Sequence, residues 1–97
     1  MKLSEATALI KMNFLAELDG FHDIMTSGPF NRLVGKDVNG TWQTIPNYYY
    51  TYDAIIPLVL KHWDTCSEST YKEKFNLGAS RDDLINYLLL ATGKLTL

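Results

Sequence analysis

The side chains best suited to chemistry in this sequence are a cysteine and a nearby histidine. Cys66, the single cysteine, follows His62 by four residues, a spacing that places both side chains on one face of a continuous helix. A cysteine beside a histidine becomes an activated nucleophile when a further residue orients the histidine. No such residue is evident, and the helix is expected to end near Asp64. We therefore interpret the pair as a helix-end histidine beside an ordinary cysteine.

Metal ligands and phosphate-binding loops are not indicated either. A structural zinc site requires three or four nitrogen or sulfur ligands in a compact set, and the chain has two histidines and one cysteine. Asp53, Asp82 and Asp83 offer oxygen atoms, but aspartates at helix starts usually cap the helix or interact with its dipole. No glycine-rich phosphate loop is present. We predict no metal, no cofactor and no catalytic residue.

A dense group of aromatic side chains is the feature that most favours a binding function. Tyr48, Tyr49, Tyr50 and Tyr52 lie within five positions, shortly after Trp42. In an extended segment alternate side chains point in opposite directions, so the four tyrosines cannot all enter one core. Tyrosine is enriched at interfaces because it combines an apolar ring with a directed hydroxyl group. We predict that Trp42, Tyr48, Tyr50 and Tyr52 contact a partner, with at least two tyrosines partly exposed. The alternative is that two pack inward and two cover the rim of the sheet.

Glu73 is the charged residue with the least usual expected position. The segment 71–77 alternates as a strand, which places Glu73 on the same face as Tyr71, Phe75 and Leu77. An unpaired buried carboxylate is costly. We therefore expect Glu73 either on an edge strand, where a charge discourages sheet-to-sheet aggregation, or in the lining of a pocket. It joins the candidate binding residues.

The elements that position these residues are predicted from apolar periodicity and turn signals. In chain order we predict a helix over 4–18, a connector over 22–29, hairpin strands over 33–38 and 41–45, a helix over 52–64, a strand over 71–77, and a helix that runs from the cap Ser80 to about residue 92. Asn39-Gly40 predicts a type I′ turn in the hairpin. The order α-β-β-α-β-α predicts a small layered α+β domain, in which an antiparallel sheet of about three strands packs against three helices.

Length and composition are those of one globular domain, residues 1–97. The chain is 46% hydrophobic and 21% charged, which is ordinary for a protein that builds one core. A net charge of −2 and nine scattered basic residues disfavour nucleic-acid binding, which requires clustered cations. No apolar run reaches the roughly 18 residues of a membrane span, and no signal-peptide pattern opens the chain. We expect a cytoplasmic protein that binds no membrane.

Two stretches of the C-terminal two thirds resemble small bacteriophage proteins. One is the segment Pro46-Asn47-Tyr48-Tyr49-Tyr50-Thr51-Tyr52-Asp53, which leads directly into the apolar helix 54–59. The other is the predicted strand 71–77 with the leucine-rich helix 82–92. Together, over about half of the chain, they resemble the phage ABA sandwich domain family and the NinX-like phage family. The chain departs from the family pattern where Tyr52 interrupts the Thr-Asp cap. The resemblance implies a phage-encoded protein in the cytoplasm of a bacterial host, and it carries over no active site.

These observations favour a protein that acts by binding and not by catalysis. We expect a phage-encoded module for protein–protein interaction that inhibits a host or anti-phage defence protein. Its partner is a host or phage protein, and homodimerisation is left open. The alternative is a small-molecule binding domain, in which the same tyrosines and Glu73 line a pocket for a nucleotide or metabolite. A hydrolase or nuclease is disfavoured, because no cluster of carboxylates for divalent metals is readable.

Overall fold

The computed structural model describes residues 1–30 and 32–97. The elements in chain order are the 3-10 turn η1 (Leu3–Glu5), helix α1 (Ala8–Leu18), strands β1 (His22–Ser27), β2 (Arg32–Lys36) and β3 (Trp42–Thr44), helices α2 (Tyr52–Lys61) and α3 (Trp63–Glu68), the 3-10 turn η2 (Lys72–Lys74) and helix α4 (Arg81–Ala91). The strands form one antiparallel sheet in the order β1-β2-β3. The predicted α+β class and the three-stranded antiparallel sheet are confirmed.

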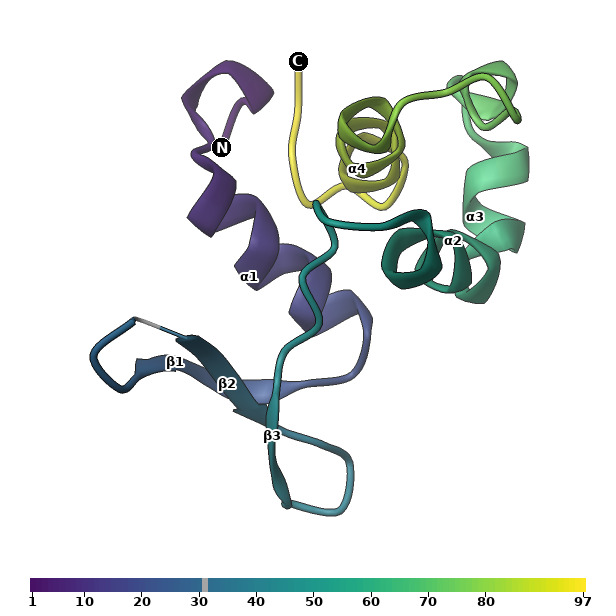
Figure 1. The fold of residues 1–97 in the computed structure, drawn as a ribbon. Helices are drawn as coiled ribbons and strands as arrows, with labels where there is room; N and C mark the ends of the chain where they lie inside the picture. Colours follow the sequence, from purple (N-terminus) through teal and green to yellow (C-terminus); the bar gives the residue numbers. More distant parts are fainter. Residues whose placement is uncertain (31) are drawn as a thin grey trace.

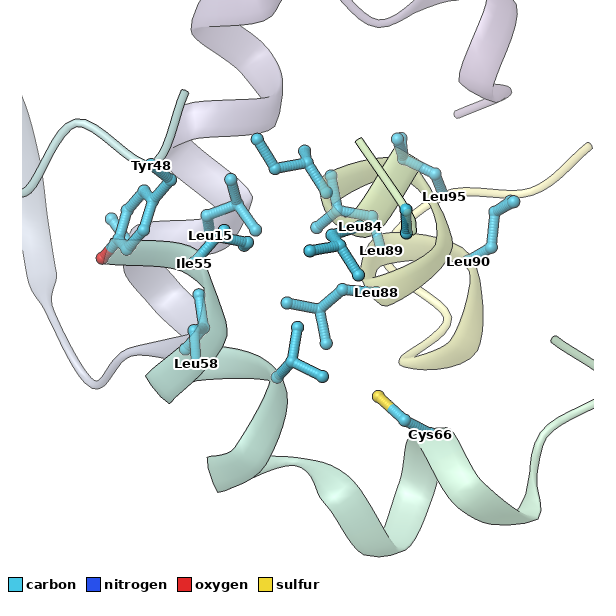
Figure 2. Packing of buried hydrophobic residues seen from close by; sticks show 14 of the residues in the cluster. Leu15, Tyr48, Ile55, Leu58, Cys66, Leu84, Leu88, Leu89, Leu90 and Leu95 are labelled. Carbon is cyan, nitrogen blue, oxygen red and sulfur yellow. The ribbon is translucent and has the colours of Figure 1, made fainter. Parts of the chain in front are cut away.

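Helix α1 lies between the sheet and the remaining helices (Figure 1). It contacts β1 on one side and α4 on the other, whereas α2 and α3 pack on α4. The core is therefore mainly helical. Five residues of α4 are buried, and Leu88 and Leu89 face Leu15 of α1 and Ile55 of α2 (Figure 2). The sheet is a side layer that covers α1. No described element covers the other face of the sheet, which points away from α1.

The two chain ends lie side by side next to α4, away from the sheet (Figure 1). The Leu3 amide donates a hydrogen bond to the Thr96 carbonyl oxygen (2.6 Å), and the Thr96 amide donates one to the Met1 carbonyl oxygen (3.0 Å). Leu95, beside this bridge, is 1% exposed and belongs to the core. The C-terminal segment is thus tied down by backbone bonds and by one apolar anchor.

The segment 71–77, predicted to be a strand, forms the turn η2 instead. The Lys74 amide donates to the Tyr71 carbonyl oxygen at 2.9 Å, as in a 3-10 turn. Tyr71 and Phe75 are four residues apart, and this spacing fits one side of a helical turn as well as the alternation of a strand. Tyr71 packs against Tyr87, with ring centroids 5.7 Å apart. The third strand of the sheet is β1, which takes the place of the strand predicted over 71–77. One helix and three strands therefore precede the remaining helices in the chain.

Strand β1 lies where a connector over 22–29 was predicted. It pairs with β2, and its register shifts between His22 and Met25. Asp23, inside this irregular stretch, has a φ of +53°, which is uncommon for a residue other than glycine. A bulge of this kind breaks the alternation of inward and outward side chains, so the strand leaves no regular pattern in the sequence.

The hairpin of β2 and β3 is confirmed, but its turn is not of type I′. Gly40 has a φ of +77°, whereas Asn39 is not in the left-handed region that a type I′ turn requires. The Gly40 amide donates to the Asp37 carbonyl oxygen, and the Asp37 amide donates to the Thr41 carbonyl oxygen, both at 3.0 Å. This is a type I turn followed by a left-handed glycine. The Asp37 carboxylate accepts from the Asn39 and Thr41 amides, which favours this turn.

The helix limits differ from prediction at two places. Helix α1 begins at Ala8 and not at residue 4, because Thr7 is its cap. The Thr7 hydroxyl accepts from the Ile10 amide at 3.2 Å. The helix expected over 52–64 breaks at His62 and continues as α3 to Glu68. The start of α4 is confirmed, since the Ser80 hydroxyl accepts from the Asp83 amide at 3.1 Å.

Candidate functional site

The tyrosine run forms a turn and not the expected extended segment. The Tyr50 amide donates to the Asn47 carbonyl oxygen at 3.1 Å, and this turn separates the rings. Tyr50 and Tyr52 are 76% and 45% exposed, so the prediction of at least two exposed tyrosines is confirmed. Tyr48 is completely buried, and its hydroxyl donates to the Asp19 carboxylate at 2.6 Å. Its predicted role as a contact residue is therefore wrong.

The remaining candidates lie apart from one another. Trp42 is half exposed on the sheet, where the Lys36 amino group lies 5.2 Å from its ring centroid. Glu73 is exposed in η2, so it is not on an edge strand, and it does not belong to the lining of the groove described below. Both predicted positions for Glu73 depended on a strand that does not form. The sequence-predicted residues do not converge on one site.

A concave site with a mostly apolar lining lies between α2–α3 and the start of α4. Its volume is about 530 Å³. We call it the apolar groove; its lining is Tyr52, Ile56, Val59, Leu60, Trp63, Phe75, Asn76, Leu77, Ala79 and Leu84. Helices α2 and α3 form one wall, the segment 75–77 forms the other, and buried residues of α2 and α4 form the floor. Tyr52 is the one predicted contact residue in this lining.

Large apolar side chains in the groove are exposed to solvent. Ile56, Leu60 and Trp63 on the helical wall are 39%, 62% and 41% exposed, and Leu77 on the opposite wall is fully exposed. The Trp63 and Phe75 rings meet edge to face, 6.3 Å apart, at one end of the groove. Clusters of exposed apolar residues on soluble domains usually mark sites of interaction.

The Tyr52 and Asn76 side chains of the groove lining are already hydrogen-bonded within the chain. The Tyr52 hydroxyl donates to the Ala79 carbonyl oxygen at 3.0 Å. The Asn76 side chain donates to the Glu73 carbonyl oxygen and accepts from the Gly78 amide, at 3.0 and 2.9 Å. A polar ligand would find few free donors or acceptors here, whereas an apolar surface loses nothing by covering these groups.

The sequence carried a signal for this groove that the prediction did not use. Helix α2 and the start of α3 have six large apolar residues within nine positions: Ile55, Ile56, Leu58, Val59, Leu60 and Trp63. Ile55, Leu58 and Val59 of these are buried, whereas Ile56, Leu60 and Trp63 are exposed. A surface helix needs one apolar stripe to reach its core. The surplus forms a second stripe on the neighbouring face, which is the groove wall.

The histidine and the cysteine of α2–α3 are not paired. The His62 ring nitrogen Nε2 lies 2.8 Å from the Leu18 carbonyl oxygen, to which it donates. Cys66 is fully buried, and burial raises the pKa of its thiol. A thiol kept protonated and covered is a poor nucleophile. This geometry supports the interpretation of a helix-end histidine beside a structural cysteine.

Two other kinds of feature are absent from residues 1–30 and 32–97. No group of three or more His, Cys, Asp or Glu side chains lies close enough to hold a metal ion in this part of the chain. Within the same ranges, no helix combines the length and apolar character needed to cross a membrane.

The comparisons with known proteins were made against family models, curated proteins and solved structures. The chain matches no family model, and no curated protein or solved structure is significantly similar to it. The apolar groove is therefore the basis on which a function is proposed.

Proposed function

We propose that this chain is a binding protein that acts through protein–protein contact at the apolar groove. The observation that carries the proposal is the exposure of four large apolar side chains around one concavity, in which the side chains of Tyr52 and Asn76 are already hydrogen-bonded. The four exposed residues are Ile56, Leu60, Trp63 and Leu77. Covering such a surface removes apolar area from water without leaving polar groups unpaired. The resemblance to small phage proteins supports a phage-encoded module that inhibits a host or defence protein in the bacterial cytoplasm.

The proposal is tested by affinity capture with matched variants. A tagged protein is incubated with bacterial lysate, and bound proteins are quantified by mass spectrometry for the wild type, Leu60→Asp and Val38→Asp. Val38 is 83% exposed at the hairpin turn, so it carries the same charge change away from the groove. We expect one set of proteins that the wild type and Val38→Asp retain and Leu60→Asp loses. Equal capture by all three proteins would reject the groove as the binding site.

The exposed tyrosines allow a second test once a partner is captured. Tyr52→Ala removes a ring of the groove wall, and we expect affinity to fall by more than about 1 kcal/mol, the scale of an interface anchor. Tyr50 lies outside the lining, so Tyr50→Ala separates the groove from the tyrosine turn. Loss of affinity in Tyr50→Ala alone would move the interface to that turn.

Binding of a small apolar molecule is the second candidate function. It is favoured by the groove volume of about 530 Å³, which lies in the range of ligand pockets. The apolar lining and the bonded state of Asn76 and Tyr52 disfavour a nucleotide, which needs free polar partners. A thermal-shift screen of apolar and polar compounds tests this function, because a ligand of the folded state raises the melting temperature. Stabilisation by apolar compounds that Leu60→Asp abolishes would favour it.

A further inference from the structure

The length of the helical groove wall indicates the form of its occupant. Tyr52, Ile56, Leu60 and Trp63 follow one another at spacings of four, four and three residues along α2 and into α3. From Tyr52 to Leu60, within α2, this wall is roughly 12 Å long at about 1.5 Å per residue, or a little over two helical turns, and Trp63 follows after the break at His62. An amphipathic helix that lies in a groove presents anchors at i, i+3 or i+4, and i+7, which cover a similar length.

The net charge of the segment that builds the groove indicates the sign of the charge that a partner should carry. The segment 52–84, which builds the groove, has six exposed carboxylates: Asp53, Asp64, Glu68, Glu73, Asp82 and Asp83. None of them forms an ion pair within the described ranges. Lys61 is paired with Asp19, so three cations, Lys72, Lys74 and Arg81, remain against the six carboxylates. The segment that builds the groove therefore carries a surplus of negative charge, although none of these carboxylates belongs to the groove lining itself.

A second copy of this chain would bring the same surplus to the interface. Like charges brought face to face across an interface repel one another, and complementary charges attract and orient the partner. Arg81 is also engaged locally, since its guanidinium lies 5.3 Å from the Tyr52 ring centroid. The charge balance therefore favours a basic partner over self-association.

We propose that the groove binds an amphipathic helix that carries large apolar residues on one face and Lys or Arg residues along its flanks. This inference rests on the proposed function, and it names the chemistry of the partner. The apolar face would cover Ile56, Leu60 and Leu77, and the basic flanks would meet the unpaired carboxylates. Apolar contact supplies the affinity, and charge supplies the preference among helices with the same apolar face.

Three synthetic peptides of about eighteen residues, long enough for four to five helical turns, test the inference. The first has leucines at i, i+3, i+4 and i+7 with lysines on the flanks; the second has the same leucines with glutamates; the third has the lysines with the leucine positions scrambled. Binding is followed by the emission of Trp63 in a Trp42→Phe background, because Trp63 lies in the groove and Trp42 does not. Light scattering gives the oligomeric state of the free protein.

We expect the first peptide to bind with a blue shift of Trp63 emission, the second to bind at least about ten-fold more weakly at low salt, and the third not to bind. The difference between the first two peptides should shrink near 1 M salt, where charges are screened beyond about 3 Å. Leu60→Asp adds a negative charge and removes an apolar contact, so its loss of binding would show that apolar contact is needed. Met25→Asp, at a 53% exposed position of the sheet, carries the same change and should bind like the wild type.

The failures of the inference and of the proposed function have different signatures. Equal affinity for the lysine and glutamate peptides, or no binding of either, overturns the basic helix, and groove-dependent capture from lysate would still support the proposed function. A dimer of the wild type that Leu60→Asp dissociates overturns the inference in favour of a second copy. If Leu60→Asp still binds the peptide and still captures the same proteins from lysate, both the inference and the proposed function are overturned. Circular dichroism and melting temperature of Leu60→Asp confirm that the variant is folded.

Discussion

Tyr48 is buried together with the polar partner that its hydroxyl requires. The ring is inaccessible to solvent, and the hydroxyl donates to the Asp19 carboxylate at the end of α1. Burial and this hydrogen bond to an anion raise the pKa of Tyr48 strongly, so the phenol stays protonated and remains a donor. The residue thus links the segment after β3 to α1 and has a structural role.

This arrangement predicts the stability of Tyr48 variants. Tyr48→Phe keeps the ring and loses the hydrogen bond, so we expect the free energy of unfolding to fall by about 1 kcal/mol. Tyr48→Ala also leaves a cavity, and a loss of about 3–5 kcal/mol is expected. Urea denaturation measures both, with Tyr50→Ala as an exposed control that changes stability by less than about 0.5 kcal/mol. A larger loss in Tyr50→Ala than in Tyr48→Ala would contradict the burial of Tyr48.

Asp37 predicts a pH dependence of the hairpin. Its carboxylate accepts hydrogen bonds from the Thr41 amide, the Asn39 amide and the Gln43 side chain. These bonds, the one from Thr41 most strongly, lower the pKa of Asp37 in the folded state. The bonds favour the charged form, so their contribution to stability is complete above the unfolded pKa of about 3.9. It is lost as the pH falls through the lower folded pKa. Urea midpoints measured between pH 5 and pH 2 should fall less in Asp37→Asn than in the wild type, and parallel falls would contradict the assignment.

At the scale of elements, local signals predicted some structures and neighbouring elements decided others. The positions of the Ser80 cap and of the hairpin turn at Gly40 were predicted correctly, because a cap or a left-handed glycine acts within a few residues. The segment 71–77 was assigned wrongly because its spacing fits two conformations, and contact of Tyr71 with Tyr87 on α4 selects the turn. No sequence rule supplies that contact. The same holds for β1, whose bulge hides its alternation.

The candidate site was predictable in part for a similar reason. Tyrosine exposure follows from crowding, and Tyr50 and Tyr52 are exposed as expected. Which ring lines a concavity depends on packing between α2 and the segment 75–77, and that packing joins residues more than ten positions apart. The second apolar stripe of α2, with Ile56 and Leu60, was visible in the sequence. The sequence alone does not show that this stripe forms a groove wall, because the opposite wall, the segment 75–77, is brought into place only by the fold.

Gly35 of β2 lies in close contact with β1 and with Ile45. A methyl group at this position would lie 3.1 Å from Ile45 Cδ1, 3.3 Å from the His22 carbonyl oxygen and 3.3 Å from Ile24 Cγ1. The carbonyl belongs to the backbone of β1 and cannot move without disturbing the pairing. We expect Gly35→Ala to lower the free energy of unfolding by about 1–3 kcal/mol, the usual cost of overpacking. Ser27→Ala, at an exposed position of β1, is the control, and equal denaturation midpoints in the two variants would contradict the close approach.

At the scale of the whole molecule, the two halves differ in how firmly they are held. Helix α4 is surrounded by α1, α2 and the C-terminal segment, whereas the sheet contacts the helical core through α1 (Figure 1). Elements with few buried apolar contacts open at lower free energy than the core. The groove lies on the helical half, and Leu84 and Val59 of its floor belong to the buried cluster. A binding surface that rests on the most stable part of the fold is preformed, which limits the entropy lost when a partner binds.

The C-terminal segment gives a prediction that tests this view of the core. Deletion of residues 95–97 removes Leu95, which is 1% exposed, and both backbone bonds of Thr96. The lost apolar contact alone is comparable to a buried leucine truncation, so we expect the free energy of unfolding to fall by at least about 2–5 kcal/mol. Deletion of residue 97 alone is the matched control, because Leu97 is 77% exposed, and a change below about 0.5 kcal/mol is expected. Thermal and urea denaturation measure both deletions. If the two shortened chains unfold at the same midpoint as the wild type, the segment does not close the core, and the anchoring role of Leu95 and the Thr96 backbone bonds would have to be abandoned.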